Sequence, residues 1–210
     1  MTRDELALLL ETSPVNETTE FAGDADDLRR AAGTAPTTPA AVLIALLDRP
    51  GGPSVLLTQR TAHLNDHAGQ ISFPGGRAEP GDPDATCTAL REAEEEVGLA
   101  RSLVDVLGCL PAYTTGSGFL VTPVVGWVVP PVTFTPDPYE VAEVFEVPFA
   151  FLMDSGNHRI ETARFRGREY RYYAMPYRGR YIWGATAGML VSMQRVLAAA
   201  RDQSANLFPD

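Results

Sequence analysis

Two short apolar runs stand in the first third of the chain, separated by turn-forming residues. Residues 40–47 read AAVLIALL, the sequence DRPGGP follows, and residues 54–60 read SVLLTQR. A short apolar run bounded by turn residues is typical of a buried strand. The pattern therefore predicts two strands joined as a hairpin.

The clearest helical pattern covers residues 83–97. Asp82 is predicted to cap its N-terminus, Pro83 to fill the first helical position, and Gly98 to end it in the left-handed conformation. We expect further strands at 104–112, 119–129 and 143–147, a hairpin of 164–176 with 179–183, and helical segments at 3–11, 24–32, 149–153 and 186–201. This irregular alternation predicts an α+β fold, with a mixed sheet and helices on its faces. The chain lacks a long linker, so we expect one domain at 37–205 behind a helical extension at 1–36.

Composition narrows the possible chemistry. The chain has 210 residues and a formal net charge of −10, and all 17 basic residues are arginines because the sequence contains no lysine. A Schiff base, a lysine general base and a P-loop lysine are therefore excluded. The acidic balance also argues against a nucleic-acid partner, since neutralising phosphates needs clustered cations.

The cysteines and the N-terminal sequence bear on location. Cys87 and Cys109 are the only cysteines. Their spacing fits free thiols in a reducing compartment better than a metal pair or a disulfide framework. The opening MTRDELALLLETS resembles neither a signal nor a transit peptide, and no run reaches the roughly 20 apolar residues of a membrane span. We expect a cytoplasmic protein with no membrane partner.

The predicted helix carries an unusual set of acids. Glu92, Glu95 and Glu96 lie within about 100° of one another around its axis, opposite a mostly apolar side. Acids at this spacing repel one another, and negative charge in the last turn opposes the helix dipole. A bound cation would reverse both effects, and carboxylate oxygens suit Mg²⁺ or Mn²⁺. A solvated helix face has the same composition, so the helix alone leaves both interpretations open.

The surroundings of this helix carry a family resemblance. The glycine-rich turn FPGG at 73–76 precedes it, and the whole segment resembles the Nudix box, G-x5-E-x7-R-E-U-x-E-E-x-G-U, where U is a bulky aliphatic residue. The matching positions are Arg91, Glu92, Glu95, Glu96, Gly98 and Leu99. One extra residue separates Gly76 from Arg91, so Asp82 or Asp84 is expected to replace the isolated glutamate. We expect Arg91 to hold the helix through a carboxylate or a backbone carbonyl rather than to touch the metal.

Further segments are similar to the coenzyme A diphosphatase branch of that family. Residues 56–60 (LLTQR), Gly69 and FPGG resemble its LLTxR…G…FPGG signature, although Asn65 stands where the branch usually has an arginine. Residues 140–148 (EVAEVFEVP) and 182–187 (IWGATA) are similar to two of its other segments. The resemblance implies an α/β/α sandwich that uses Mg²⁺ or Mn²⁺. It also implies hydrolysis of coenzyme A, or an acyl derivative, to 3′,5′-ADP and 4′-phosphopantetheine or its acyl form.

The resemblance assigns expected roles to individual acids. Glu92 and Glu96 are the expected direct metal ligands, and Glu95 is expected to act as a ligand, a water-mediated partner or a catalytic group. Glu140 and Glu143 are candidates for a general base outside the helix. Solvated loop acids would have the same sequence, so either role remains open for these two.

Substrate contacts are expected around the glycine-rich turn. Gly75 and Gly76 permit a tight turn that brings this loop close to the helix. Arg60 is the first candidate for a phosphate contact and Arg77 the second, because a guanidinium fork matches phosphate oxygens. His67 could bond phosphate or water, or simply be an exposed loop residue.

Arginines also crowd a later segment, residues 159–180. Alternation in RFRGREYRYY predicts Arg164, Arg166 and Arg168 on one face of a strand. That face could be a polar outer surface, an electrostatic guide for an anionic substrate, or a dimer contact. The sequence is compatible with a monomer or a homodimer.

Two other functions remain open. The same chemistry could act on ADP-ribose, a dinucleotide or a nucleoside triphosphate. The fold could also serve as a non-catalytic nucleotide sensor, although such a domain would be expected to lose the metal carboxylates that this helix keeps.

Overall fold

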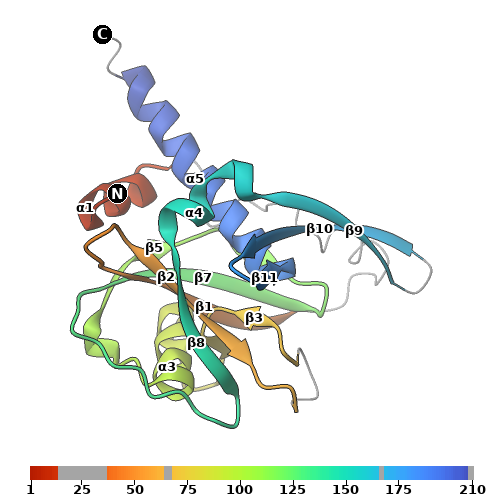
Figure 1. Ribbon diagram of the computed structural model, residues 1–210. Helices are drawn as coiled ribbons and strands as arrows, with labels where there is room; N and C mark the ends of the chain where they lie inside the picture. Colours follow the sequence, from red (N-terminus) through yellow and green to blue (C-terminus); the bar gives the residue numbers. More distant parts are fainter. Residues whose placement is uncertain (14–36, 64–67, 166–167, 208–210) are drawn as a thin grey trace.

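A mixed sheet with helices on both of its faces forms the body of the protein (Figure 1). The structure is a computed structural model, and it describes residues 1–13, 37–63, 68–165 and 168–207. The large sheet has the strand order β3-β2-β1-β7-β5, to which β4, β6 and β8 are added. Its strands are β1 (Thr38–Leu47), β2 (Ser54–Arg60), β3 (Ile71–Ser72), β4 (Gly75–Arg77), β5 (Val104–Cys109), β6 (Tyr113–Thr114), β7 (Phe119–Val128) and β8 (Val141–Pro148).

The remaining elements are four α-helices, two single 3₁₀ turns and a small sheet, counted over the described residues. The helices are α1 (Arg3–Glu11), α3 (Ala85–Val97), α4 (Phe149–Met153) and α5 (Gly184–Leu207), and the turns are η1 (Arg101–Leu103) and η2 (Ser155–Asn157). The small sheet is antiparallel and contains β9 (Arg159–Phe165), β10 (Arg168–Tyr177) and β11 (Arg180–Trp183). The predicted α+β sandwich is therefore confirmed.

Strand β1 lies between the two cores of the protein because its side chains alternate between faces. Leu43 and Leu47 point to one face and pack with the apolar side of α3. Ile44 and Leu46 point to the other face, where α5 and α1 cover the sheet. All of these side chains are fully buried, so one continuously apolar strand serves both layers, as expected for a central strand.

Several sequence predictions require correction. The strand expected at 104–112 ends at Cys109, and a separate strand, β6, follows it. The predicted hairpin is present as β10 paired with β11, but its first strand begins at Arg168, and residues 159–165 form a separate strand, so Arg164 lies on β9 and Arg168 on β10. These two residues therefore do not share a face of one strand, and Arg166 lies outside the described residues.

The predicted helix at 3–11 is confirmed, and it packs against the body of the protein. Leu6 is fully buried in the same core as α5, and Arg3 pairs with Asp105 on the edge strand β5. The helix predicted at 24–32 lies outside the described residues. Within the described part of the chain, no helix is long and apolar enough to cross a bilayer.

Candidate active site

Helix α3 begins two residues later than the sequence predicts. Asp84, not Asp82, is its N-cap, and the Asp84 carboxylate accepts a hydrogen bond of 2.7 Å from the Cys87 amide. Pro83 therefore precedes the cap instead of filling the first helical position. Gly98 ends the helix in the left-handed conformation (φ 69°), as expected. The change of cap leaves the carboxylate of Asp82 available for other partners.

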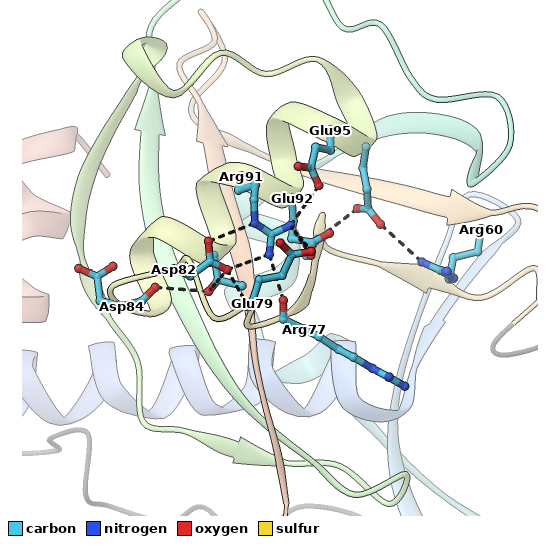
Figure 2. A network of polar contacts seen from close by, with 11 residues as sticks. Arg60, Arg77, Glu79, Asp82, Asp84, Arg91, Glu92 and Glu95 are labelled. Carbon is cyan, nitrogen blue, oxygen red and sulfur yellow. Dashed lines mark hydrogen bonds and ion pairs between the residues drawn. The ribbon is translucent and has the colours of Figure 1, made fainter.

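Arg91 is the centre of the polar cluster along α3 (Figure 2). Its Nε and Nη2 donate to the two carboxylate oxygens of Asp82, at 3.1 and 2.9 Å. Nη1 donates to Glu92 at 2.9 Å and to Glu95 at 3.1 Å, while Nη2 also donates to the carbonyl of Arg77 at 3.0 Å. One guanidinium thus joins the helix to the loop before it and to strand β4.

Asp82 lies six residues after Gly76, which is the spacing at which the box has its isolated acid. Besides the bidentate pair with Arg91, it accepts hydrogen bonds from the Thr88 hydroxyl and the Glu79 amide. The Arg91 guanidinium is the main reason that the pKa of the Asp82 carboxyl falls well below its usual range. The sequence leaves Asp82 and Asp84 as alternatives, and the structure separates them: Asp84 caps the helix and Asp82 anchors it.

The carboxylates of Glu92 and Glu96 are held against the glycine turn. Glu96 is only 7 % exposed, and its Oε2 accepts a hydrogen bond of 3.1 Å from the Gly75 amide. Glu92 is 18 % exposed and lies so close to Gly76 that an added Cβ would come within 2.5 Å of its carboxyl carbon. Gly75 itself faces the backbone of β1, because a Cβ there would come within 2.5 Å of the Ala41 carbonyl oxygen.

Burial makes the charged forms of these two acids costly. It raises the pKa of Glu96 to about 7, and it also raises the pKa of Glu92. The negative charges of Glu140 and of the neighbouring helix acids raise both values further. Glu95 differs from them because it is 60 % exposed, although it bonds Arg91 as Glu92 does.

Arg60 and Glu140 approach the same acids from the end of the sheet. Arg60 ends β2, and its Nη1 lies 3.5 Å from the Glu96 carboxylate. Its Nη2 lies 3.9 Å from the carboxylate of Glu140, which directly precedes β8. The Arg60 guanidinium therefore lies between Glu96 of α3 and Glu140 at the start of β8.

Glu143 lies elsewhere. The predicted strand 143–147 begins at Val141, so Glu143 lies inside β8 rather than at its start. It alternates in step with Phe145, which packs in the α5 core, so it points away from α3. There it pairs with Arg180, whose guanidinium stacks over the Phe145 ring at 4.2 Å. The two candidate bases are thus on different faces of the sheet.

The remaining candidates are only partly placed. The Arg77 carbonyl belongs to the cluster, but the Arg77 side chain runs away from it and stacks over Phe119 at 5.2 Å (Figure 2). His67 lies outside the described residues.

The donor set fits a hard divalent cation. Among the described residues, no three acids, imidazoles or thiols form a ready-made coordination shell. Magnesium, however, commonly binds through one or two carboxylates and keeps several waters. Glu92 and Glu96 supply one half-buried and one buried carboxylate on neighbouring turns, and Arg60 is the only cation paired with Glu96 in the described part of the chain. A cation at these oxygens would offset the desolvation that raises both pKa values.

Comparison with known proteins assigns the family. The model of the NUDIX domain matches residues 37–164, which is more than half of the chain. The chain belongs to the Nudix family. Two Nudix relatives are the uncharacterized Nudix hydrolases NudL of Photorhabdus laumondii and of Escherichia coli K12. They are 44 % identical over 152 residues and 43 % identical over 151 residues, respectively. Each alignment covers 72 % of this chain, and 80 % and 78 % of the relatives.

Solved Nudix-like structures agree on the fold. The MutT protein of Methanosarcina mazei Go1 superposes with a TM-score of 0.51 at 17 % identity, over 81 % of this chain and 98 % of that chain. The Nudix hydrolase RenU of M. smegmatis also gives a TM-score of 0.51, at 21 % identity, over 83 % and 89 % of the two chains. The protein is therefore a Nudix hydrolase by family, and Nudix hydrolases generally use divalent metal ions.

Proposed function

We propose that this Nudix hydrolase cleaves the diphosphate bond of coenzyme A or its acyl derivatives in the presence of Mg²⁺ or Mn²⁺. The products would be 3′,5′-ADP and 4′-phosphopantetheine, or the acyl form of the latter. The pair of carboxylates held against the turn at 73–76, the buried Glu96 and the half-buried Glu92, carries the proposal of metal-dependent hydrolysis. The similarity of residues 56–76 to the coenzyme A signature supports the choice of substrate.

The arrangement suits cleavage of an anionic diphosphate. Bound divalent metal would neutralise phosphate oxygens and lower the pKa of an attacking water. Glu92 and Glu96 would hold it, with Glu95 reaching it directly or through water. Arg60 would bond a phosphate oxygen once the metal has taken over its partner Glu96, because its guanidinium lies 3.5 Å from that carboxylate.

Glu140 is the better placed of the two candidate bases. Its carboxylate shares Arg60 with Glu96, whereas Glu143 is bonded to Arg180 on the opposite face of the sheet. We therefore assign the water-activating role to Glu140. Glu143 instead fixes the Arg180 guanidinium over Phe145.

A product analysis tests the reaction and the substrate together. The protein is incubated with Mg²⁺ or Mn²⁺ and coenzyme A, an acyl-coenzyme A, ADP-ribose, NADH or a diadenosine polyphosphate, and the products are separated by chromatography. We expect coenzyme A or its acyl form to give the highest kcat/KM. A preference for ADP-ribose would overturn the substrate assignment, and binding of nucleotide without turnover would favour a sensing role.

Two matched variants on α3 test the metal assignment. Glu96→Gln should lower kcat by several orders of magnitude while the protein stays folded, because it removes a metal ligand with almost no change of shape. Glu94→Gln is the control, since Glu94 lies on the same helix but pairs with Arg101. Near-normal activity in E96Q would contradict the role given to Glu96.

A further inference from the structure

The segment that carries Glu140 is tied to the C-terminal end of α3. The Thr135 amide donates to the Val97 carbonyl and the Asp137 amide donates to the Glu96 carbonyl, both at 2.9 Å. The last carbonyls of a helix have no partner within the helix, so an outside donor is needed to satisfy them. Here the chain leading to β8 supplies two such donors. One of them binds the carbonyl of Glu96, the residue whose side chain is a buried carboxylate.

Asp137 then builds the turn before Glu140. Its carboxylate accepts the Tyr139 amide at 2.8 Å, which is the pattern of an Asx turn. Its carbonyl accepts the amides of Glu140 and Val141 at 3.1 and 2.8 Å. The backbone at Glu140 is thereby fixed relative to Asp137, and through Asp137 to α3.

Thr61 holds the same segment from the sheet side. This residue directly follows Arg60 and is only 7 % exposed. Its amide donates to the Glu140 carbonyl at 2.9 Å, and its hydroxyl donates to the Tyr139 carbonyl at 2.8 Å. Because Thr61 and Arg60 are adjacent, the cation and the acid that it faces are anchored by neighbouring residues.

We propose that Thr61 and Asp137 are positioning residues that hold the Glu140 carboxylate towards the acids of α3. The proposal rests on the function proposed for Glu140, and it adds that the two tethers act on catalysis through that carboxylate alone. Neither tether side chain bonds Arg60, Glu92 or Glu96 in the described structure, and the backbone bond from Asp137 to the Glu96 carbonyl is kept in every side-chain variant, so we expect metal and phosphate binding to change little.

The experiment compares variants that remove each tether with variants that keep it. Thr61→Val and Asp137→Ala remove the hydroxyl donor and the carboxylate acceptor, whereas Thr61→Ser and Asp137→Asn retain them. We expect kcat to fall on the order of tenfold to a hundredfold in T61V and D137A, with KM changed less than about twofold, and to recover in T61S and D137N. Thr186→Val is the matched control, because Thr186 is also 7 % exposed and its hydroxyl donates to the Ile71 carbonyl at 2.9 Å.

Amide hydrogen exchange gives a readout that needs no substrate. The peptide covering 137–141 should exchange faster in T61V and D137A than in the wild type or T186V, since both substitutions release the turn. Unchanged exchange together with unchanged kcat would overturn the proposal. If T61V does not fold, D137A and D137N carry the same comparison.

Combination with Glu140→Gln separates this proposal from the function on which it rests. In the E140Q background, T61V should lower kcat no further, because the group it positions is already inactive. An additional full loss would show that Thr61 acts elsewhere, which overturns the positioning role and leaves Glu140 intact as the base. Near-normal activity of E140Q alone would instead remove the assignment of Glu140. The measurements use whichever diphosphate in the panel the wild type hydrolyses best.

Discussion

Adding one methyl group at each of two neighbouring glycines should affect different properties of this protein, stability at Gly75 and activity at Gly76. A Cβ at Gly75 would lie 2.5 Å from the Ala41 carbonyl oxygen and 2.6 Å from the Val42 Cα, both of which are backbone atoms of the central strand. A Cβ at Gly76 would lie 2.5 Å from the carboxyl carbon of Glu92, which is the end of a flexible side chain. The first clash involves the backbone of the central strand, and the second involves a side chain of the candidate active site.

The distances set the expected magnitudes. At Gly75 the strand must yield, and overpacking of this kind costs about 3 kcal/mol. For a chain of this size such a loss lowers the Tm by about 6–12 °C. At Gly76 the Glu92 carboxylate must move by about 1 Å to reach an ordinary contact distance, and such a displacement of a reacting group can lower kcat by about 100-fold.

The assays are thermal unfolding and steady-state kinetics on both variants. Gly75→Ala should lose much of its thermal stability, whereas Gly76→Ala should melt within about 2 °C of the wild type, which is under 1 kcal/mol, and should bind Mg²⁺ more weakly. A normal kcat and Mg²⁺ affinity in G76A would refute the idea that Gly76 makes room for the Glu92 carboxylate. Equal loss of stability in the two variants would refute the distinction between the backbone and side-chain contacts.

Three further predictions concern acid stability, metal binding and the N-terminal helix. Because folding lowers the pKa of Asp82 below its ordinary value of 3.8, its stabilising effect is present above that pH and is lost progressively as the pH falls further. Thermal melts should therefore show Asp82→Asn destabilised at pH 7, with the gap to the wild type narrowing steadily as the pH falls below that value. Mg²⁺ at about 100 times its Kd should stabilise the wild type by about 2.7 kcal/mol, and raise the Tm by about 5–11 °C, through binding to the folded state. E96Q should lose most of this rise, and chelation should reverse it in the wild type. Leu6→Ala should lower the free energy of unfolding in urea by about 2–5 kcal/mol, because Leu6 is fully buried. The kcat of the folded fraction should stay unchanged. A loss below about 0.5 kcal/mol would show that α1 is not held by this core.

The sequence allowed the sheet, the acidic helix and the close approach of the glycine turn to be predicted, because each has a strong local signal. Apolar runs bounded by turn residues gave β1 and β2, and the same-face spacing of Glu92 and Glu96 gave the paired carboxylates. The cap of α3 was misplaced because two aspartates flank Pro83 and either can cap. The choice depends on Arg91, which needs Asp82 as its partner nine residues away.

Other features of the candidate site depend on contacts between distant parts of the chain, which local sequence patterns do not predict. Glu140 and Glu143 are three residues apart, and only the start of β8 and its irregular pairing at Arg60 decide which face of the sheet each one meets. Thr61 gave no signal at all, since a threonine at the end of a strand is ordinary. Asp137 did leave one, because Asp-Pro-Tyr is a sequence that favours an Asx turn.

The parallel pairing of β1 with β7 has a consequence for how the protein folds. The two strands are in register from Thr38 opposite Phe119 to Leu47 opposite Val128, so the glycine turn and α3 lie within the stretch of chain that this pairing encloses. Strands so distant in sequence meet late in folding, because a long loop must close before their contacts form. Helix α3 rests on both strands through Leu43 and Val124. One of the two strands that support the helix behind its carboxylates is therefore in place only after the centre of the sheet has closed. In a partly folded chain the proposed cation site would lack this support, so metal affinity would report whether the centre of the sheet has closed.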